Sequence, residues 1–180
     1  IRVSGSANVI FNDSVIRDNS AEGRGGALYL HERGSVSFTG TNVISGNVID
    51  RVNNNSQHGG GFWADDFATV NVSGNLTITD NHAGAGGGGF YIGDQVVFDA
   101  SSASSLIISE NNDETTRNDG DGAGFYVNNN AIAKLNNATI INNGDINVGN
   151  ILDGADAAGN DTRHGGAFRA SGNSTVEITG

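Results

Sequence analysis

Residues capable of acid–base chemistry occur in two small groups along this chain. His58 stands close to Asp65 and Asp66, and His164 stands close to Arg169. Hydrolysis of a glycosidic bond needs two carboxyl groups flanking the bond, and a polysaccharide lyase needs a basic residue beside a cation site. Asp65 and Asp66 are neighbours at the end of a predicted strand, so their side chains should point in different directions. The two groups therefore do not predict an enzyme.

The two histidines share one position of a repeat. His58 and His164 each precede a pair of glycines directly, where other repeats carry Arg24, Gly86 and Asp121. Such variation is typical of a tolerant turn, and we expect this position to face solvent.

Acidic, glycine-rich loops are the candidate cation ligands. Asp119-Gly120-Asp121 and Asp153-Gly154-Ala155-Asp156 offer carboxylate oxygens, which Ca²⁺ prefers. Their spacing matches neither an EF-hand nor a calcium-binding nonapeptide repeat, so we expect no cofactor, with Ca²⁺ as the weaker alternative. An ice-binding face would need regular threonine ladders, whereas Thr77-Ile78-Thr79 stands alone.

Aromatic residues are the best candidates for binding. Every Tyr and the only Trp fall in the middle of a triplet with apolar outer residues, as in Leu28-Tyr29-Leu30, and Arg takes that place in the first and last repeats. The middle residues are Arg2, Tyr29, Trp63, Tyr91, Tyr126 and Arg169. Successive side chains of a β-strand point to opposite faces, so these residues should form a column on the surface. Exposed rings stack on sugars and Arg adds cation–π contacts, which makes the column a candidate binding site.

Two other interpretations of the column stay open. The rings could serve only to stabilise the sheet as a ladder between neighbouring strands. Alternatively, the 21-residue segment 144–164 could cover them. The apolar residues of that segment are Ile146, Val148, Ile151 and Leu152.

A repeat frame positions these residues. The triplet recurs six times, and the residues eight and ten positions after its first member are apolar in every repeat. A third segment ends in Ile-x-x-Asn in five repeats, as at Ile44 and Asn47. Self-similarity at this period marks a solenoid or a propeller, and the short alternating strands without hairpin signals favour a parallel β-helix. We predict an all-β fold, a right-handed, single-stranded parallel β-helix of about six coils, with the hand taken from the crossover preference of parallel strands.

Equivalent residues of successive coils should stack at about 4.8 Å per coil. The isoleucines of the third segment should form an interior ladder, and its asparagines a ladder that bonds neighbouring amides and turn backbone. The glycine pairs should supply positive φ angles at a corner. The isoleucines are Ile16, Ile44, Ile78, Ile108 and Ile140.

Composition narrows the classes of partner. The 180 residues carry a net charge of −11, which argues against nucleic acid or an anionic membrane surface as partner. No apolar run is long enough to span a membrane, and a chain without cysteine leaves the redox compartment open. Residues 1–180 begin and end inside a coil, so we expect a single β-helix segment of a longer repeat protein. Head-to-tail assembly into a filament is the alternative, because uncapped coils expose strand backbone.

Two short motifs resemble those of a known family. Gly25-Gly26-Ala27-Leu28 and Gly165-Gly166-Ala167-Phe168, alternating with Ile-x-x-Asn, resemble the GGA(I/L/V) and FxxN repeats of chlamydial polymorphic outer membrane proteins and similar bacterial surface β-helix proteins. The resemblance implies an autotransporter passenger displayed on the cell surface and involved in adhesion. We therefore expect a non-catalytic, extracellular adhesive module whose partners are surface glycans or proteins of host or neighbouring cells, or copies of itself. A polysaccharide-active enzyme is the alternative.

Overall fold

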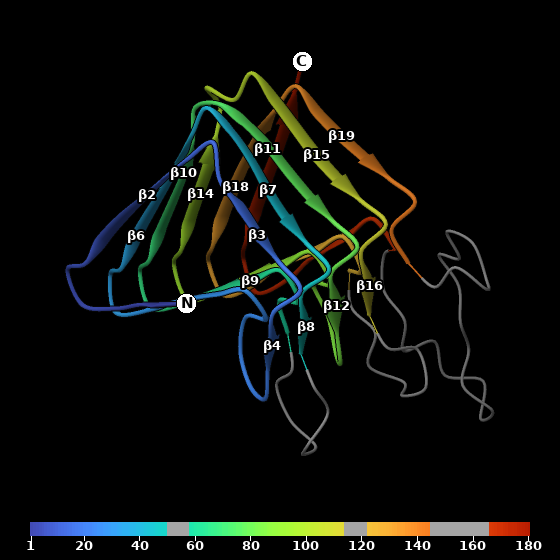
Figure 1. The fold of residues 1–180 in the computed structure, drawn as a ribbon, viewed down its shortest axis with the longest axis horizontal. Coiled ribbons are helices and arrows are strands. Elements are labelled where there is room, and N and C mark those ends of the chain that lie inside the picture. The colour runs from blue at the N-terminus through green and yellow to red at the C-terminus, as the bar shows by residue number, and fades with distance from the viewer. Residues whose placement is uncertain (50–57, 114–121, 145–165) are drawn as a thin grey trace.

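The computed structural model describes residues 1–49, 58–113, 122–144 and 166–180 (Figure 1). Its described part contains strands but no helix, and the strands pair in parallel into four sheets. Strands that neighbour one another in a sheet come from successive repeats, which is the topology of a parallel β-helix and confirms the predicted fold class. The right-handed sense of the coil stays a prediction.

Three sheets enclose a triangular interior (Figure 1). Sheet A contains β1 (Arg2–Val3), β5 (Leu28–Leu30), β9 (Phe62–Ala64), β13 (Phe90–Ile92), β17 (Phe125–Val127) and β20 (Phe168–Ala170). Sheet B contains β2 (Asn8–Asn12), β6 (Ser35–Thr39), β10 (Thr69–Val72), β14 (Val97–Ala100), β18 (Ile132–Asn136) and β21 (Thr175–Thr179). Sheet C contains β3 (Val15–Arg17), β7 (Thr41–Ser45), β11 (Asn75–Thr79), β15 (Ser105–Ser109) and β19 (Ala138–Ile141).

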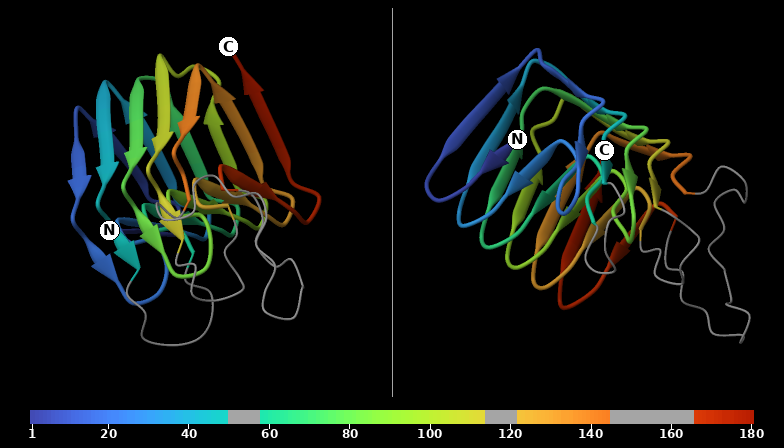
Figure 2. Two further views of the ribbon diagram at one scale, coloured as in Figure 1. Left: turned by 90° about the vertical axis from the view of Figure 1, so that its right-hand side faces the viewer. Right: turned by 60° about the horizontal axis from the view of Figure 1, so that its bottom comes forward.

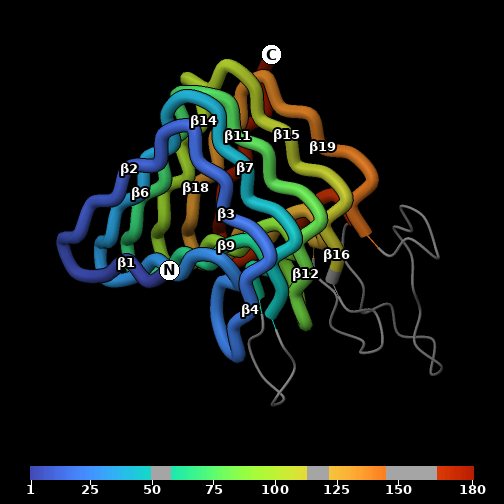
Figure 3. Tube along the Cα trace, in the orientation of Figure 1, coloured from blue at the N-terminus to red at the C-terminus, as the bar shows by residue number. Residues whose placement is uncertain are grey.

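A fourth, narrow sheet leaves the triangle at the corner where sheet C ends. Sheet D contains β4 (Ser20–Ala21), β8 (Val48–Ile49), β12 (His82–Ala83) and β16 (Asn112–Asp113). Its strands extend past sheet A on the outer side of the triangle, as the Cα trace in Figure 3 and the turned views in Figure 2 show. Sheet D thus stands beside the outer face of sheet A.

Ladders of identical side chains fill the interior. The rings of Phe62, Phe90, Phe125 and Phe168 stack with centroids 4.8–4.9 Å apart and planes within 2–6° of parallel. The isoleucines of sheet C, of which Ile44 and Ile78 are one pair, face one another in register and confirm the predicted interior ladder.

The asparagine ladder is also confirmed. The backbone N–H and the side-chain Nδ2 of Asn81 both donate to Oδ1 of Asn111, at 3.1 and 3.0 Å, and the same pair of bonds joins Asn111 to Asn143. Each Nδ2 also donates to a carbonyl of the preceding coil, for example from Asn111 to Ile78 at 2.9 Å. Amides that would otherwise be buried without partners are thereby satisfied at the bend between sheets C and D.

The predicted positive φ is confirmed for the first glycine of the corner. The second glycine does not have a positive φ. Gly59 and Gly87 have φ of 74° and 62°, in the left-handed region. Gly60 and Gly88 lie outside that region and are needed because of close packing. A Cβ on Gly60 would lie 2.6 Å from the backbone of His82 in sheet D, so the absence of side chains lets sheet D lie directly behind the corner.

Candidate functional site

The predicted column exists as one continuous row on the outer face of sheet A. Strand pairing places its six members in register from coil to coil. In order they are Arg2, Tyr29, Trp63, Tyr91, Tyr126 and Arg169. The aromatic members form a cluster of their own, separate from the interior core.

The expected exposure of the column is wrong for three of its four rings. Trp63, Tyr91 and Tyr126 are only 5, 6 and 7% exposed, and Tyr29 is half-buried. Trp63 and Tyr91 lie 4.3 Å apart between ring centroids, which packs them tightly against one another. The burial favours a structural role for these three rings, whereas Tyr29 and Arg169, towards the two ends of the column, are partly exposed.

His58 is one of the residues that cover the column. Its ring lies 5.0 Å from that of Tyr91, 5.5 Å from that of Trp63 and 5.8 Å from that of Tyr126, measured between centroids. The prediction that His58 occupies a tolerant, solvent-facing turn is therefore wrong. The reason is that the His58 side chain lies over the outer face of sheet A, against the aromatic rings.

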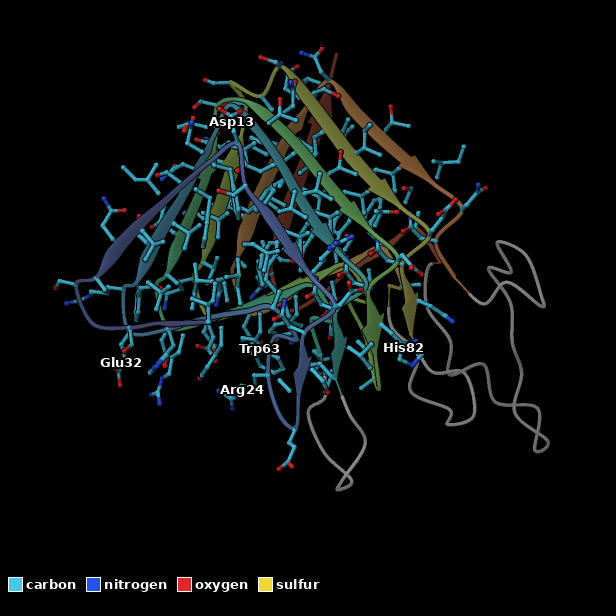
Figure 4. The ribbon with its side chains drawn as sticks, in the orientation of Figure 1. Asp13, Arg24, Glu32, Trp63 and His82 are labelled. Atoms are coloured by element: carbon cyan, nitrogen blue, oxygen red, sulfur yellow. The ribbon has the colours of Figure 1, made fainter. Side chains whose placement is uncertain are left out.

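Arg24 takes the same position in the preceding coil and also covers the column. Its guanidinium carbon lies 4.7 Å from the Trp63 ring and 5.6 Å from the Tyr29 ring. Figure 4 shows Trp63 on the outer side of sheet A and Arg24 farther out, beyond it. Arg24 is not among the predicted binding residues. The occurrence of Arg and His at the same repeat position could have indicated it, because both side chains stack on aromatic rings.

A hydrogen-bonded cluster forms where Arg24 meets sheet A. Nη1 of Arg24 donates to the Tyr29 hydroxyl at 2.8 Å and to Oδ2 of Asp65 at 2.9 Å. Nε1 of Trp63 donates to the same carboxylate oxygen at 2.9 Å. Asp65 therefore holds both the arginine and the indole in fixed positions.

Asp65 is 4% exposed, and the Oδ1 of its carboxyl accepts no hydrogen bond within the described part of the chain. Burial raises its pKa, and the bonds from Trp63 and Arg24 oppose that rise in part. Its neighbour Asp66 is exposed with a φ of 52°, in the turn that follows. The two carboxyls thus differ in environment and do not form a pair on one face, as expected.

A second small cluster lies at the Arg2 end of the column. Nε of Arg2 donates to Nε2 of His31 at 2.8 Å, so this histidine accepts with its unprotonated nitrogen. The His31 ring stacks on Tyr29 at 4.7 Å and 10° between planes, and the guanidinium carbon of Arg2 lies 5.9 Å from the Tyr29 centroid. Two guanidinium groups, those of Arg2 and Arg24, therefore lie close to one half-buried tyrosine ring.

The opposite end of the column has a different, neutral network. The Tyr126 hydroxyl bonds Oγ of Ser171 at 3.0 Å, and that Oγ donates to Oδ1 of Asn128 at 2.9 Å. The guanidinium carbon of Arg169 lies 5.1 Å from the Tyr126 ring. Burial raises the pKa of the Tyr91 hydroxyl, which accepts from Asn128 at 3.4 Å. These bonds fix the two tyrosine hydroxyls at this end of the column.

Several predicted candidates lie outside the described residues. These are His164, Asp121 and the remaining residues of both acidic loops, together with the apolar residues of 144–164. Within the described residues no cluster of three or more His, Cys, Asp or Glu side chains could hold a metal ion, and no helix is long and apolar enough to cross a membrane. Thr77 lies between Val43 and Ile107 in sheet C, so it is not part of a threonine ladder.

Comparisons with known proteins add no family. No protein-family model, no curated protein and no solved structure matches this chain.

Proposed function

We propose that this chain is a non-catalytic, adhesive β-helix module of an extracellular or cell-surface protein. The observation that carries the proposal is the pairing of Arg24 with Tyr29 on the outer face of sheet A, where the Arg24 side chain is 44% exposed. Aromatic and arginine side chains are the residues that most often dominate the energy of a binding surface.

The scaffold beneath this surface supports the proposal. The buried phenylalanine ladder packs on the inner side of sheet A, the asparagine ladder fixes the bend between sheets C and D, and Asp65 holds Arg24 on the outer side of sheet A. A binding group held in place before the ligand arrives loses less conformational entropy on binding. A rod of this kind suits presentation of a contact surface to another cell, and the resemblance to bacterial surface repeats points the same way.

The carboxyl groups near the surface support binding over catalysis. Glycoside hydrolysis requires two carboxyls on opposite sides of one bond. Asp65 is buried beneath Arg24 and Asp66 is exposed in the neighbouring turn, so they do not flank a common space. The partners that we propose are glycans or proteins on a host or neighbouring cell.

Binding and turnover assays test this function. Labelled chain should bind to cells or to an immobilised glycan panel, and the double variant R24Q/Y29A should bind at least tenfold more weakly, as expected when two central contacts are lost. Incubation with acidic and neutral polysaccharides should give no new reducing ends or unsaturated products. Turnover that is abolished by Asp65→Asn or Asp66→Asn would overturn the proposal in favour of the enzyme.

A further inference from the structure

We infer that the corner between sheets A and B is a second contact surface, centred on Phe67, that binds a cationic segment of a partner protein. The inference goes beyond the function proposed above, because this corner is separate from the surface formed by Arg24 and Tyr29. Glu32 marks the corner in Figure 4, apart from Arg24. The inference follows from an exposed aromatic side chain on strained backbone and from the charge of the turns stacked beside it.

Phe67 is exposed in the middle of the rod. It is 50% exposed, and it follows β9, the third of the six strands of sheet A. Turns of neighbouring coils stack on both sides of it. The N–H of Arg33 donates to the carbonyl of Asp66 at 2.9 Å, and the N–H of Phe67 donates to the carbonyl of Asp94 at 3.0 Å. The exposure of Phe67 is therefore a property of the corner itself.

The backbone at Phe67 is unfavourable for the residue that it carries. Phe67 has a φ of 62° and Asp66 a φ of 52°. Gly, Asn and Asp are the usual residues in such turns, and a bulky residue at positive φ is an outlier. The equivalent turn after β17 has Asn129 and Asn130 at φ of 49° and 62°, so the corner does not require phenylalanine. A half-exposed ring recovers only part of the cost, and strain that stability does not explain points to function.

The stacked turns supply a negative charge beside the ring. Asp66 and Asp94 take the same place in neighbouring coils, about 4.8 Å apart along the rod, and both are exposed. No residue of the described part of the chain forms an ion pair with either carboxylate. Asp94 accepts one hydrogen bond, from Nδ2 of Asn129 at 3.0 Å. Two like charges at this spacing attract a cation from solvent.

The Phe67 ring already contacts one cation. The guanidinium carbon of Arg33, in the preceding coil, lies 5.8 Å from the ring centroid. The following coil carries Asp94 and the neutral Gln95 at this corner, and both are exposed. A cation that approaches from the side of the following coil is attracted by the carboxylates and by the aromatic ring.

A lysine or arginine side chain of a partner protein fits this surface. Its apolar stem packs on an aromatic ring while its charged end stays in water beside the carboxylates. A neutral sugar leaves the negative charge without a partner, and an inorganic cation leaves the ring without an apolar contact. A second copy of this chain is repelled, because each copy carries a net charge of −11. A protein segment with several cationic side chains is therefore the favoured partner.

Titration of the intact chain with two defined probes tests the inference. The probes are octalysine and the neutral sugar cellotetraose, followed by backbone NMR and by calorimetry. We expect octalysine to bind and to shift the amide signals of residues 66–67 and 94–95 most, and cellotetraose to leave those signals unchanged. Binding of octalysine should weaken as salt concentration rises.

Two matched double variants separate this corner from general attraction to an acidic chain. D66N/D94N removes both carboxylates beside Phe67, and asparagine tolerates their positive φ. D80N/E110Q is the control, because it removes the same charge from exposed residues at positive φ in neighbouring coils, at the corner where sheet C ends. We expect D66N/D94N to weaken octalysine binding by about fivefold and the control to weaken it by less than about twofold.

Phe67→Gly tests the ring. It should weaken octalysine binding by about threefold, as expected for the loss of an exposed cation–π contact. Its thermal midpoint should lie above that of Phe67→Ala, because both variants lack the ring and only glycine accepts the positive φ without strain. A midpoint below that of Phe67→Ala would remove the strain on which the inference rests.

The remaining outcomes assign the corner differently. Equal losses for the two double variants, or unchanged binding by Phe67→Gly, would overturn the contact surface. Tighter binding of cellotetraose than of octalysine would make the corner a glycan site, and self-association that Phe67→Gly abolishes would make it an interface between copies; either result refutes the cationic partner. None of these results bears on the Arg24 and Tyr29 surface, which R24Q/Y29A tests separately.

Discussion

Truncation of the central aromatic residue tests the conclusion that most of the column is buried. Trp63 is 5% exposed, its ring packs against Tyr91 and His58, and its Nε1 donates to Asp65. A buried aromatic side chain removes about 200 Å² from water, which at about 25 cal/mol per Å² corresponds to about 5 kcal/mol. Because an unfolded chain already hides part of this area, we expect Trp63→Ala to lower the free energy of unfolding by about 3–5 kcal/mol.

Urea unfolding followed by far-ultraviolet circular dichroism measures this change. Fluorescence is unsuitable, since Trp63 is the only tryptophan of the chain. Phe67→Ala is the control, because Phe67 is an aromatic residue of the same coil that is 50% exposed, and its loss should cost only about 1 kcal/mol. Equal, small losses for the two variants would refute the burial of the column and restore an exposed aromatic binding face.

Three further substitutions test the scaffold. Asn111→Ala should destabilise the protein by about 3 kcal/mol, because it leaves the buried Asn81 amide without its acceptor and removes the side-chain bond to the Ile78 carbonyl. Hydrogen exchange at the Asn81 amide should accelerate. Gly88→Ala should lower the thermal midpoint of unfolding, because the new Cβ would overlap the carbonyl oxygens of Asn112 and Ala123. Gly23→Ala is the control and should leave the midpoint unchanged, because a Cβ there meets nothing within 4 Å. Asp65→Asn tests the raised pKa of that carboxyl. The wild-type carboxyl binds a proton more tightly in the folded than in the unfolded chain. The stability of the wild type relative to the variant should therefore fall as pH rises from the ordinary pKa of 3.8 through the raised pKa. A relative stability that rises over this range would show that the folded pKa is lowered instead.

Periodicity alone predicted the parts of the fold that repeat. Ile78 and Asn81 recur at fixed spacing from coil to coil, and in a parallel β-helix fixed spacing means direct stacking. The positive φ of Gly59 followed from its place at a corner, and the column followed from alternation within strands of three residues. Each of these features is decided within one coil or between adjacent coils.

Burial of the column could not be predicted in the same way. The strands of sheet D, such as β8 (Val48–Ile49) and β12 (His82–Ala83), have two residues each, too few to show any alternation. The sequence segments that follow these strands vary in length from repeat to repeat. The repeat spacing therefore does not predict their positions relative to sheet A. Whether Trp63 meets solvent depends on Arg24 and His58, which lie over its ring, and on Gly60, whose missing side chain lets sheet D approach closely.

The residue before the glycine corner determines what the outer face of sheet A presents. Its side chain is the one that reaches back over the column, as Arg24 does over Trp63 and His58 does over Tyr91. An imidazole such as that of His58 packs on the rings beneath it, whereas the guanidinium of Arg24 covers a ring and is still 44% exposed as a side chain. Substitution at this one position can therefore convert a coil from a sealed part of the scaffold into a binding coil without disturbing the ladders inside. Variation at this position would suit the binding surface that we propose, because it changes the outer face of a coil and leaves the interior ladders in place.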